Sequence, residues 1–138
     1  MPGAGKGYNK SMRLFKPVYA HCDLPCGVYD PAQARIEAES VLMMMKKYPD
    51  LDDHNKTRAI ILKEQRAELV KHHLWVLWTD YFKPEHLTKY PDLHDKFWKA
   101  TKQAGECKHH LEPAEGEKLL EMIDEIAVIF AETKAAKA

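Results

Sequence analysis

Four stretches of this chain repeat apolar residues every three or four positions, and no other feature limits the possible folds as strongly. Such stretches form amphipathic helices, which must bury their apolar stripes against one another. No stretch alternates apolar and polar residues as a half-buried strand would, and there is no internal repeat. The 138 residues suit one domain, and the connections between the stretches are short. The sequence therefore predicts an all-α fold, an up-and-down four-helix bundle.

Proline residues and acidic caps mark the expected ends of the helices. Asp30 provides an N-cap with Pro31 at the first helical position, and Tyr48-Pro49 stops the first helix. The other three helices are expected to run from the acidic turn 50–53 to about Tyr81, from Pro91 to just before Gly105, and from near Pro113 onward. Cys107 would then lie in a polar loop between the last two helices.

The apolar stripes predict which side chains form the core. In chain order these are Ala34, Ala38, Val41, Leu42, Met45, Ile61, Leu62, Leu69, Leu74, Leu77, Leu93, Phe97, Trp98, Ala100, Leu119, Leu120, Ile123, Ile126, Ala127 and Phe130. The charged side chains of the second helix are expected to face mostly solvent, namely Lys63, Glu64, Arg66, Glu68 and Lys71.

The first twenty residues differ in composition from the rest. They hold four basic residues and no acid, although the whole chain balances 21 basic against 21 acidic residues. Arg13, Lys16 and Pro17 interrupt their apolar part, which argues against a secretory signal. Residues 1–20 are interpreted as a disordered basic tail, a removable pro-segment or an organelle transit peptide, and 21–138 as the folded domain. The balanced charge and the lack of a long apolar run predict no nucleic-acid and no membrane partner.

Two cysteines and a histidine lie together just before the first predicted helix. Cys22 and Cys26 flank Pro25, and Gly27 follows, so a compact loop rather than a helix must carry them. Two thiolates in such a loop suit a metal site, a disulfide or simple burial. The imidazole of His21 favours the metal, but the spacing alone leaves all three interpretations open.

The other histidines and the third cysteine are weaker candidates. Neighbouring side chains on a helix diverge by about 100°, so the pairs His72-His73 and His109-His110 are expected to be solvated or interfacial rather than chelating. The remaining candidates stand alone, without ligand partners at suitable spacing: His54, His86, His94 and Cys107. No phosphate-binding glycine loop, zinc-binding helix or nucleophile elbow is present in the sequence.

Two long motifs are more specific than the cysteine spacing. Residues 21–37 read HCDLPCGVYDPAQARIE, and a second block begins at residue 63 with KEQRAEL and ends at residues 80–84 with DYFKP. Both resemble the nickel superoxide dismutase family, the first as its N-terminal nickel hook and first helix. The likeness extends more loosely to the last helix and so covers essentially residues 21–138.

The resemblance implies a nickel site made from three residues. In that family a leader is removed and the hook histidine becomes the first residue, which implies cleavage between Ala20 and His21 by a processing protease. The implied ligands are the freed α-amine and imidazole of His21, the backbone nitrogen and thiolate of Cys22, and the thiolate of Cys26. Two nitrogens and two thiolates suit square-planar nickel(II), and the imidazole suits an axial position on nickel(III).

The resemblance also assigns residues around the metal. Glu37 and Arg66 match positions that orient the axial imidazole. Tyr29 and Tyr81 match residues that line a small access pocket. The resemblance implies a catalytic role for Tyr29 as well as for the hook residues. Asp23 and a cis peptide bond before Pro25 are expected to shape the hook.

The implied activity is dismutation of superoxide to oxygen and hydrogen peroxide, with one nickel ion per subunit of a homohexamer. Lys83 is expected to help attract the superoxide anion. Three cysteines, an odd number, fit a reducing compartment, so a cytoplasmic location is expected, or an organelle if the leader is a transit peptide. Two alternatives use the same hook: a non-catalytic nickel or copper carrier, and a thiol-disulfide sensor.

Overall fold

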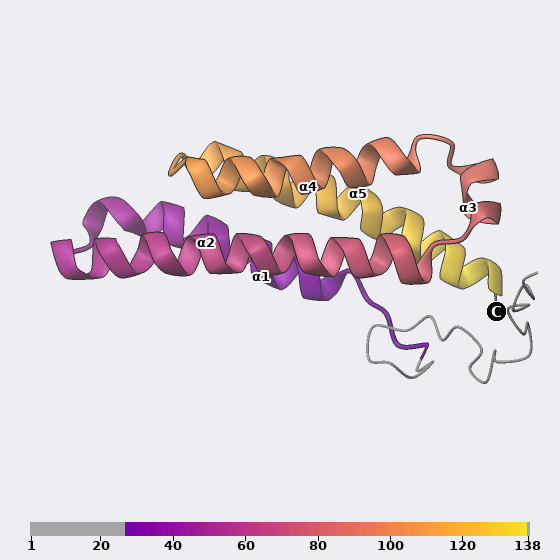
Figure 1. Ribbon diagram of the computed structural model, residues 1–138, viewed down its shortest axis with the longest axis horizontal. Coiled ribbons are helices and arrows are strands. Elements are labelled where there is room, and N and C mark those ends of the chain that lie inside the picture. The colour runs from indigo at the N-terminus through magenta and orange to yellow at the C-terminus, as the bar shows by residue number, and fades with distance from the viewer. Residues whose placement is uncertain (1–26, 138) are drawn as a thin grey trace, which may run out of the picture.

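The structure, a computed structural model, describes residues 27–137, and all the regular elements in this range are helical. In chain order they are α1 (Ala32–Lys47), a 3₁₀ turn (Tyr48–Asp50), α2 (Asp53–Val76), a π-helical turn (Leu77–Tyr81), α3 (Pro84–Lys89), α4 (Leu93–His109) and α5 (Pro113–Lys137). Figure 1 shows the four long helices side by side, with the short α3 at one end. The predicted four-helix bundle is confirmed, and α3 is an element that the sequence patterns did not predict.

Each long helix packs against two others. α1 contacts α2 and α5, and α4 contacts the same two helices, so the core lies between all four. The predicted stripe of α1 is completely buried. The stripe of α5 is largely buried, although Leu120 and Ala127 are only half-buried. None of the described helices is long and apolar enough to cross a membrane.

The buried face of α2 differs from the predicted one. Ile61 and Leu69 are 53% and 37% exposed, whereas Lys63, which was expected in solvent, is 2% exposed. The residues that α2 buries are Ala59, Lys63, Ala67, Val70 and Leu74. The prediction was wrong because it followed the larger apolar side chains, while the face that α2 buries carries two alanines and a lysine. The α4 prediction was wrong at one position, since Trp98 is 62% exposed.

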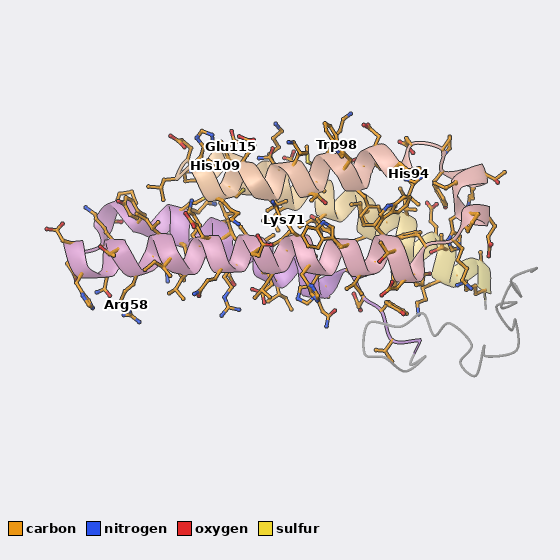
Figure 2. The ribbon with its side chains drawn as sticks, viewed as in Figure 1. Arg58, Lys71, His94, Trp98, His109 and Glu115 are labelled. Atoms are coloured by element: carbon orange, nitrogen blue, oxygen red, sulfur yellow. The ribbon has the colours of Figure 1, made fainter. Side chains whose placement is uncertain are left out.

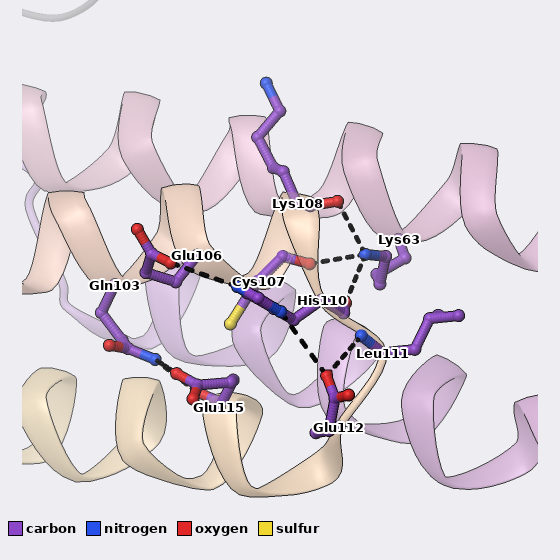
Figure 3. Close-up of polar contacts among 9 residues, drawn as sticks. All are labelled: Lys63, Gln103, Glu106, Cys107, Lys108, His110, Leu111, Glu112 and Glu115. Carbon is purple, nitrogen blue, oxygen red and sulfur yellow. Dashed lines mark hydrogen bonds and ion pairs between the residues drawn. The ribbon is translucent and has the colours of Figure 1, made fainter.

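The C-terminal end of α4 explains why a lysine is buried. The Lys63 ammonium donates hydrogen bonds to the carbonyl oxygens of Cys107, Lys108 and His110 at 2.6, 2.9 and 2.6 Å (Figure 3). The last carbonyls of a helix have no partner within it, so a cation from α2 satisfies them here. α4 therefore continues through Gly105 to His109, and Cys107 is buried in the helix rather than placed in a loop. The predicted end of this helix was wrong for that reason.

Replacing Lys63 by Met is expected to destabilise the fold strongly. The substitution keeps most of the side-chain volume but leaves three carbonyls without their donor, which costs about 3 kcal/mol. Urea unfolding followed by circular dichroism measures the difference. Lys99→Met is the control, because Lys99 forms only an exposed ion pair with Asp95 one turn away. Equal unfolding midpoints for the two variants would contradict this account of Lys63.

The end of α2 widens from an α-helical to a π-helical turn. The N–H of Phe82 donates to the carbonyl of Leu77 at 3.1 Å, a five-residue spacing. Leu77 and Tyr81 are both buried within this turn. Pro84, which has no N–H to donate, then begins α3. The π turn thus sets the position of Tyr81 at the end of the bundle where α3 lies.

Candidate functional site

The described part of the chain begins at Gly27, the residue that follows the predicted hook in the sequence. His21, Cys22, Asp23, Pro25 and Cys26, and the predicted cis bond with them, lie outside the described residues. Gly27 has a φ of +67°, a left-handed conformation that favours glycine, and no atom of residues 27–137 lies close enough to hinder a Cβ there. Asp30 then accepts a hydrogen bond from the N–H of Ala32 at 2.8 Å, which starts α1. The sequence after the hook is therefore built to turn and enter a helix.

A cavity of about 600 Å³ lies where this entry segment meets the π turn and the end of α5. Its lining residues are Gly27, Tyr29, Thr79, Asp80, Tyr81, Phe82, Lys83, Pro84, Lys134 and Lys137. Three lysines and a single carboxylate give this surface an excess of positive charge, which favours an anion over a cation. Lys83, predicted from sequence, is joined here by two lysines of α5 that the sequence analysis did not single out.

Tyr29 and Tyr81 form one wall of the cavity. Their ring centroids are 5.8 Å apart, with the planes tilted by 54°. Tyr81 also contacts Phe130, with ring centroids 4.4 Å apart, and its hydroxyl lies 2.8 Å from the hydroxyl of Thr133. The ammonium groups of Lys134 and Lys137 lie 5.7 and 5.0 Å from the centre of the Tyr81 ring. The structure thus brings together two tyrosines that are far apart in the sequence, and it adds a set of α5 side chains around one of them.

Glu37 and Arg66 form an ion pair between α1 and α2. One terminal nitrogen of Arg66 donates to both carboxylate oxygens of Glu37, at 3.2 and 3.1 Å. The Glu37 side chain is 16% exposed, which distinguishes this pair from the more exposed ion pairs of the surface. A half-buried carboxylate with one side held by a guanidinium can accept another hydrogen bond in a fixed direction.

Three histidines outside the hook lie on α3 and α4. The His86 Nδ1 atom accepts a hydrogen bond from the N–H of Lys83 at 3.0 Å, and burial lowers the pKa of this imidazole. His94 packs edge-on against Trp78, at 4.3 Å between centroids. Figure 2 shows His94 and Trp98 on the same side of the bundle and His109 at the far end of α4. His86 thus caps a helix, His94 packs against an aromatic ring, and His109 is exposed.

Residues 27–137 contain no group of three or more His, Cys, Asp or Glu side chains that could hold a metal ion. Cys107 lies within this range, and burial raises the pKa of its thiol to about 12. Cys107 is also completely buried and has no second or third ligand beside it among the described residues. The hook residues therefore have no competitor for a metal within the described part of the chain.

Sequence reasoning missed the contribution of α5 to this site. Thr133, Lys134 and Lys137 are adjacent to the cavity or to Tyr81, but they are about 50 residues from Tyr81 along the chain. The one available signal was that Thr133 falls on the buried stripe of α5, three residues after Phe130. A polar residue on an apolar stripe indicates a buried hydrogen bond, but not its partner.

Three comparisons with known proteins agree with one another. The family model for nickel-containing superoxide dismutase matches residues 16–134. The superoxide dismutase [Ni] of Streptomyces coelicolor is 57% identical over 128 residues, which cover 90% of this chain and 98% of that protein. A native structure of nickel superoxide dismutase superimposes with a TM-score of 0.81 at 56% identity, over 83% of this chain and 99% of the solved one.

A structure of a nickel superoxide dismutase variant, in which a histidine at the first position is replaced by alanine, superimposes with a TM-score of 0.76. It is 54% identical and covers 78% of this chain and 99% of its own length. The family match spans most of the chain, and the identity extends through nearly the whole length of the relatives. The chain belongs to the nickel-containing superoxide dismutase family.

Proposed function

We propose that the chain catalyses dismutation: two superoxide anions and two protons become one oxygen molecule and one hydrogen peroxide molecule. The observation that carries this proposal is the 57% identity to a superoxide dismutase [Ni] over 98% of that protein's length. The cavity supports it, because an anionic substrate suits a surface with three lysines and one carboxylate.

The proposed cofactor is one nickel ion per chain, held by His21, Cys22 and Cys26. The donor set fits nickel, since two thiolates and nitrogen donors form the tetragonal environment that nickel(II) prefers. When bound, nickel supplies a redox couple that accepts an electron from one superoxide and returns it to another. Because the thiols must lose their protons to bind the metal, loading is favoured at neutral to alkaline pH and under reducing conditions.

The proposed mature chain begins at His21, after a protease has removed residues 1–20. A solved variant with its first histidine replaced supports the same start. A free amine at His21 provides a nitrogen donor that a peptide bond to Ala20 would remove.

Glu37, fixed by Arg66, is the proposed partner of the His21 imidazole. A carboxylate that accepts the N–H of a ligand imidazole fixes the orientation of its ring and raises its basicity. Tyr29 and Tyr81 line the approach to the hook, and Lys83 attracts the anion together with Lys134 and Lys137. Asp23 and Pro25 are proposed to fix the shape of the hook itself.

Glu37→Gln is expected to lower the rate of superoxide consumption per bound nickel by about 10- to 100-fold. The amide keeps the size of the side chain but weakens both the ion pair with Arg66 and the hydrogen bond to the imidazole. Glu68→Gln is the matched control, since Glu68 on α2 is exposed and pairs with Lys108 of α4. A Glu37→Gln variant as active as the control would remove Glu37 from the proposed site.

The proposed assembly is a homohexamer in the cytoplasm. Large apolar side chains are exposed on several helices, as expected for a subunit with further contacts: Ile36, Met43, Ile61, Trp75, Trp98 and Val128. A reducing compartment suits the proposed site, because the hook cysteines must stay as thiols until nickel binds. If residues 1–20 act as a transit peptide, the compartment is an organelle.

The test of the proposed function uses the chain that begins at His21, with and without nickel, under reducing conditions. We expect one nickel per chain and rapid superoxide consumption that disappears when the metal is removed. Nickel binding without turnover would indicate the carrier instead. Failure to bind nickel under these reducing conditions would indicate the thiol-disulfide sensor.

A further inference from the structure

Thr133 is a buried polar residue on the apolar stripe of α5. It is 5% exposed, and its neighbours on the stripe are large apolar side chains such as Ile129 and Phe130. Its hydroxyl donates to the carbonyl oxygen of Phe130 at 2.8 Å and lies 2.8 Å from the hydroxyl of Tyr81. Two buried hydroxyl groups are thus joined across the boundary between α5 and the π turn.

The proton of each hydroxyl can be assigned by counting donors. A threonine hydroxyl has a single proton, and here that proton goes to the Phe130 carbonyl. The Tyr81 hydroxyl must then be the donor of the bond between the two side chains. Thr133 therefore holds the phenol proton of Tyr81 on the α5 side and leaves an oxygen lone pair free to accept a hydrogen bond.

Packing alone does not fix this hydroxyl. The Tyr81 ring lies among Tyr29, Phe82 and Phe130, with centroid distances of 5.8, 5.0 and 4.4 Å. These apolar contacts define where the ring lies, but they place no constraint on the phenol proton. Of the contacts described around Tyr81, the bond to Thr133 is the one that constrains the phenol proton.

We propose that Thr133 is a positioning residue for the dismutation reaction, acting through the buried hydroxyl of Tyr81, a residue that lines the cavity beside Tyr29. The inference rests on the proposed function. Its physical basis is that a phenol whose proton is held by a buried acceptor keeps one arrangement of hydrogen-bond donor and acceptor. Without Thr133 the phenol proton loses that acceptor and must turn to another, and the order of water and substrate beside Tyr29 changes with it.

The experiment compares Thr133→Val, Thr133→Ser, Tyr81→Phe and the Thr133→Val/Tyr81→Phe double variant in the nickel-loaded chain. Valine keeps the shape and suits the apolar stripe, whereas serine keeps the hydroxyl. We expect Thr133→Val to lower kcat/KM by about tenfold and Thr133→Ser to restore most of it. The double variant should be no slower than Tyr81→Phe, because both changes remove one shared interaction.

A second readout does not depend on activity. In chains carrying ¹³C at the Cζ atom of tyrosine, the Tyr81 signal should shift in Thr133→Val and stay in place in Thr133→Ser. An unmoved signal, a Thr133→Val or Tyr81→Phe rate equal to that of the unsubstituted chain, or additive losses in the double variant would overturn the inference. If the unsubstituted nickel-loaded chain is itself inactive, the proposed function fails, and the ¹³C signal still decides whether the hydrogen bond exists.

Discussion

A chain that starts at Ala20 is expected to show no nickel-dependent superoxide consumption, while a chain that starts at His21 is fully active. The two differ by one residue, which has no functional group of its own. In the longer chain the nitrogen of His21 is part of a peptide bond, so it cannot act as an amine ligand. The proposed donor set would then lack one of the nitrogens that hold nickel.

The measurement is superoxide decay by stopped-flow spectroscopy on both chains, at equal nickel content. The full chain with residues 1–20 attached serves as a third sample, and it should be as inactive as the Ala20 chain. Loss of activity in the full chain alone would mean that the length of the leader blocks the site. In that case the free amine would not be the essential feature.

Replacing either hook thiolate should abolish activity as well. A serine hydroxyl stays protonated at neutral pH and is a poor ligand for a soft site, so Cys22→Ser and Cys26→Ser should lose both nickel and turnover. Nickel content is measured by atomic absorption, and the rate by superoxide decay.

Cys107→Ala is the matched control for the loss of a thiol. Cys107 is buried inside α4, and its thiol stays protonated because burial raises its pKa to about 12. The variant should bind nickel and turn over normally, with a loss of about 1 kcal/mol in stability from the small cavity. If Cys26→Ser kept its nickel, or if Cys107→Ala lost it, the assignment of the ligands would be wrong.

The sequence predicted the helices well where apolar periodicity and burial coincide. The α1 stripe from Ala34 to Met45 is buried as predicted, because every large apolar residue on that helix face points into the core. On α2 the two do not coincide. Lys63 occupies a core position because it donates hydrogen bonds to carbonyls more than 40 residues away. No pattern in the nearby sequence indicates that these carbonyls need a donor.

The candidate site also contains residues that the sequence predicted and residues that only the folded structure brings together. The hook and the roles of Glu37 and Arg66 near the imidazole followed from motif resemblance, and the structure adds the ion pair between these two side chains. The roles inferred for Thr133 and Lys137 depend on where α5 ends relative to Tyr81. That relation is set by the packing of the whole bundle, so a reading of residues along the chain could not supply it.

The most direct test is the intact mass of the active protein, purified from its native source and combined with metal analysis of the same sample. We expect a chain that begins at His21 and carries one nickel ion. Full activity in a protein whose mass retains Met1, or in one that contains no nickel, would contradict the account.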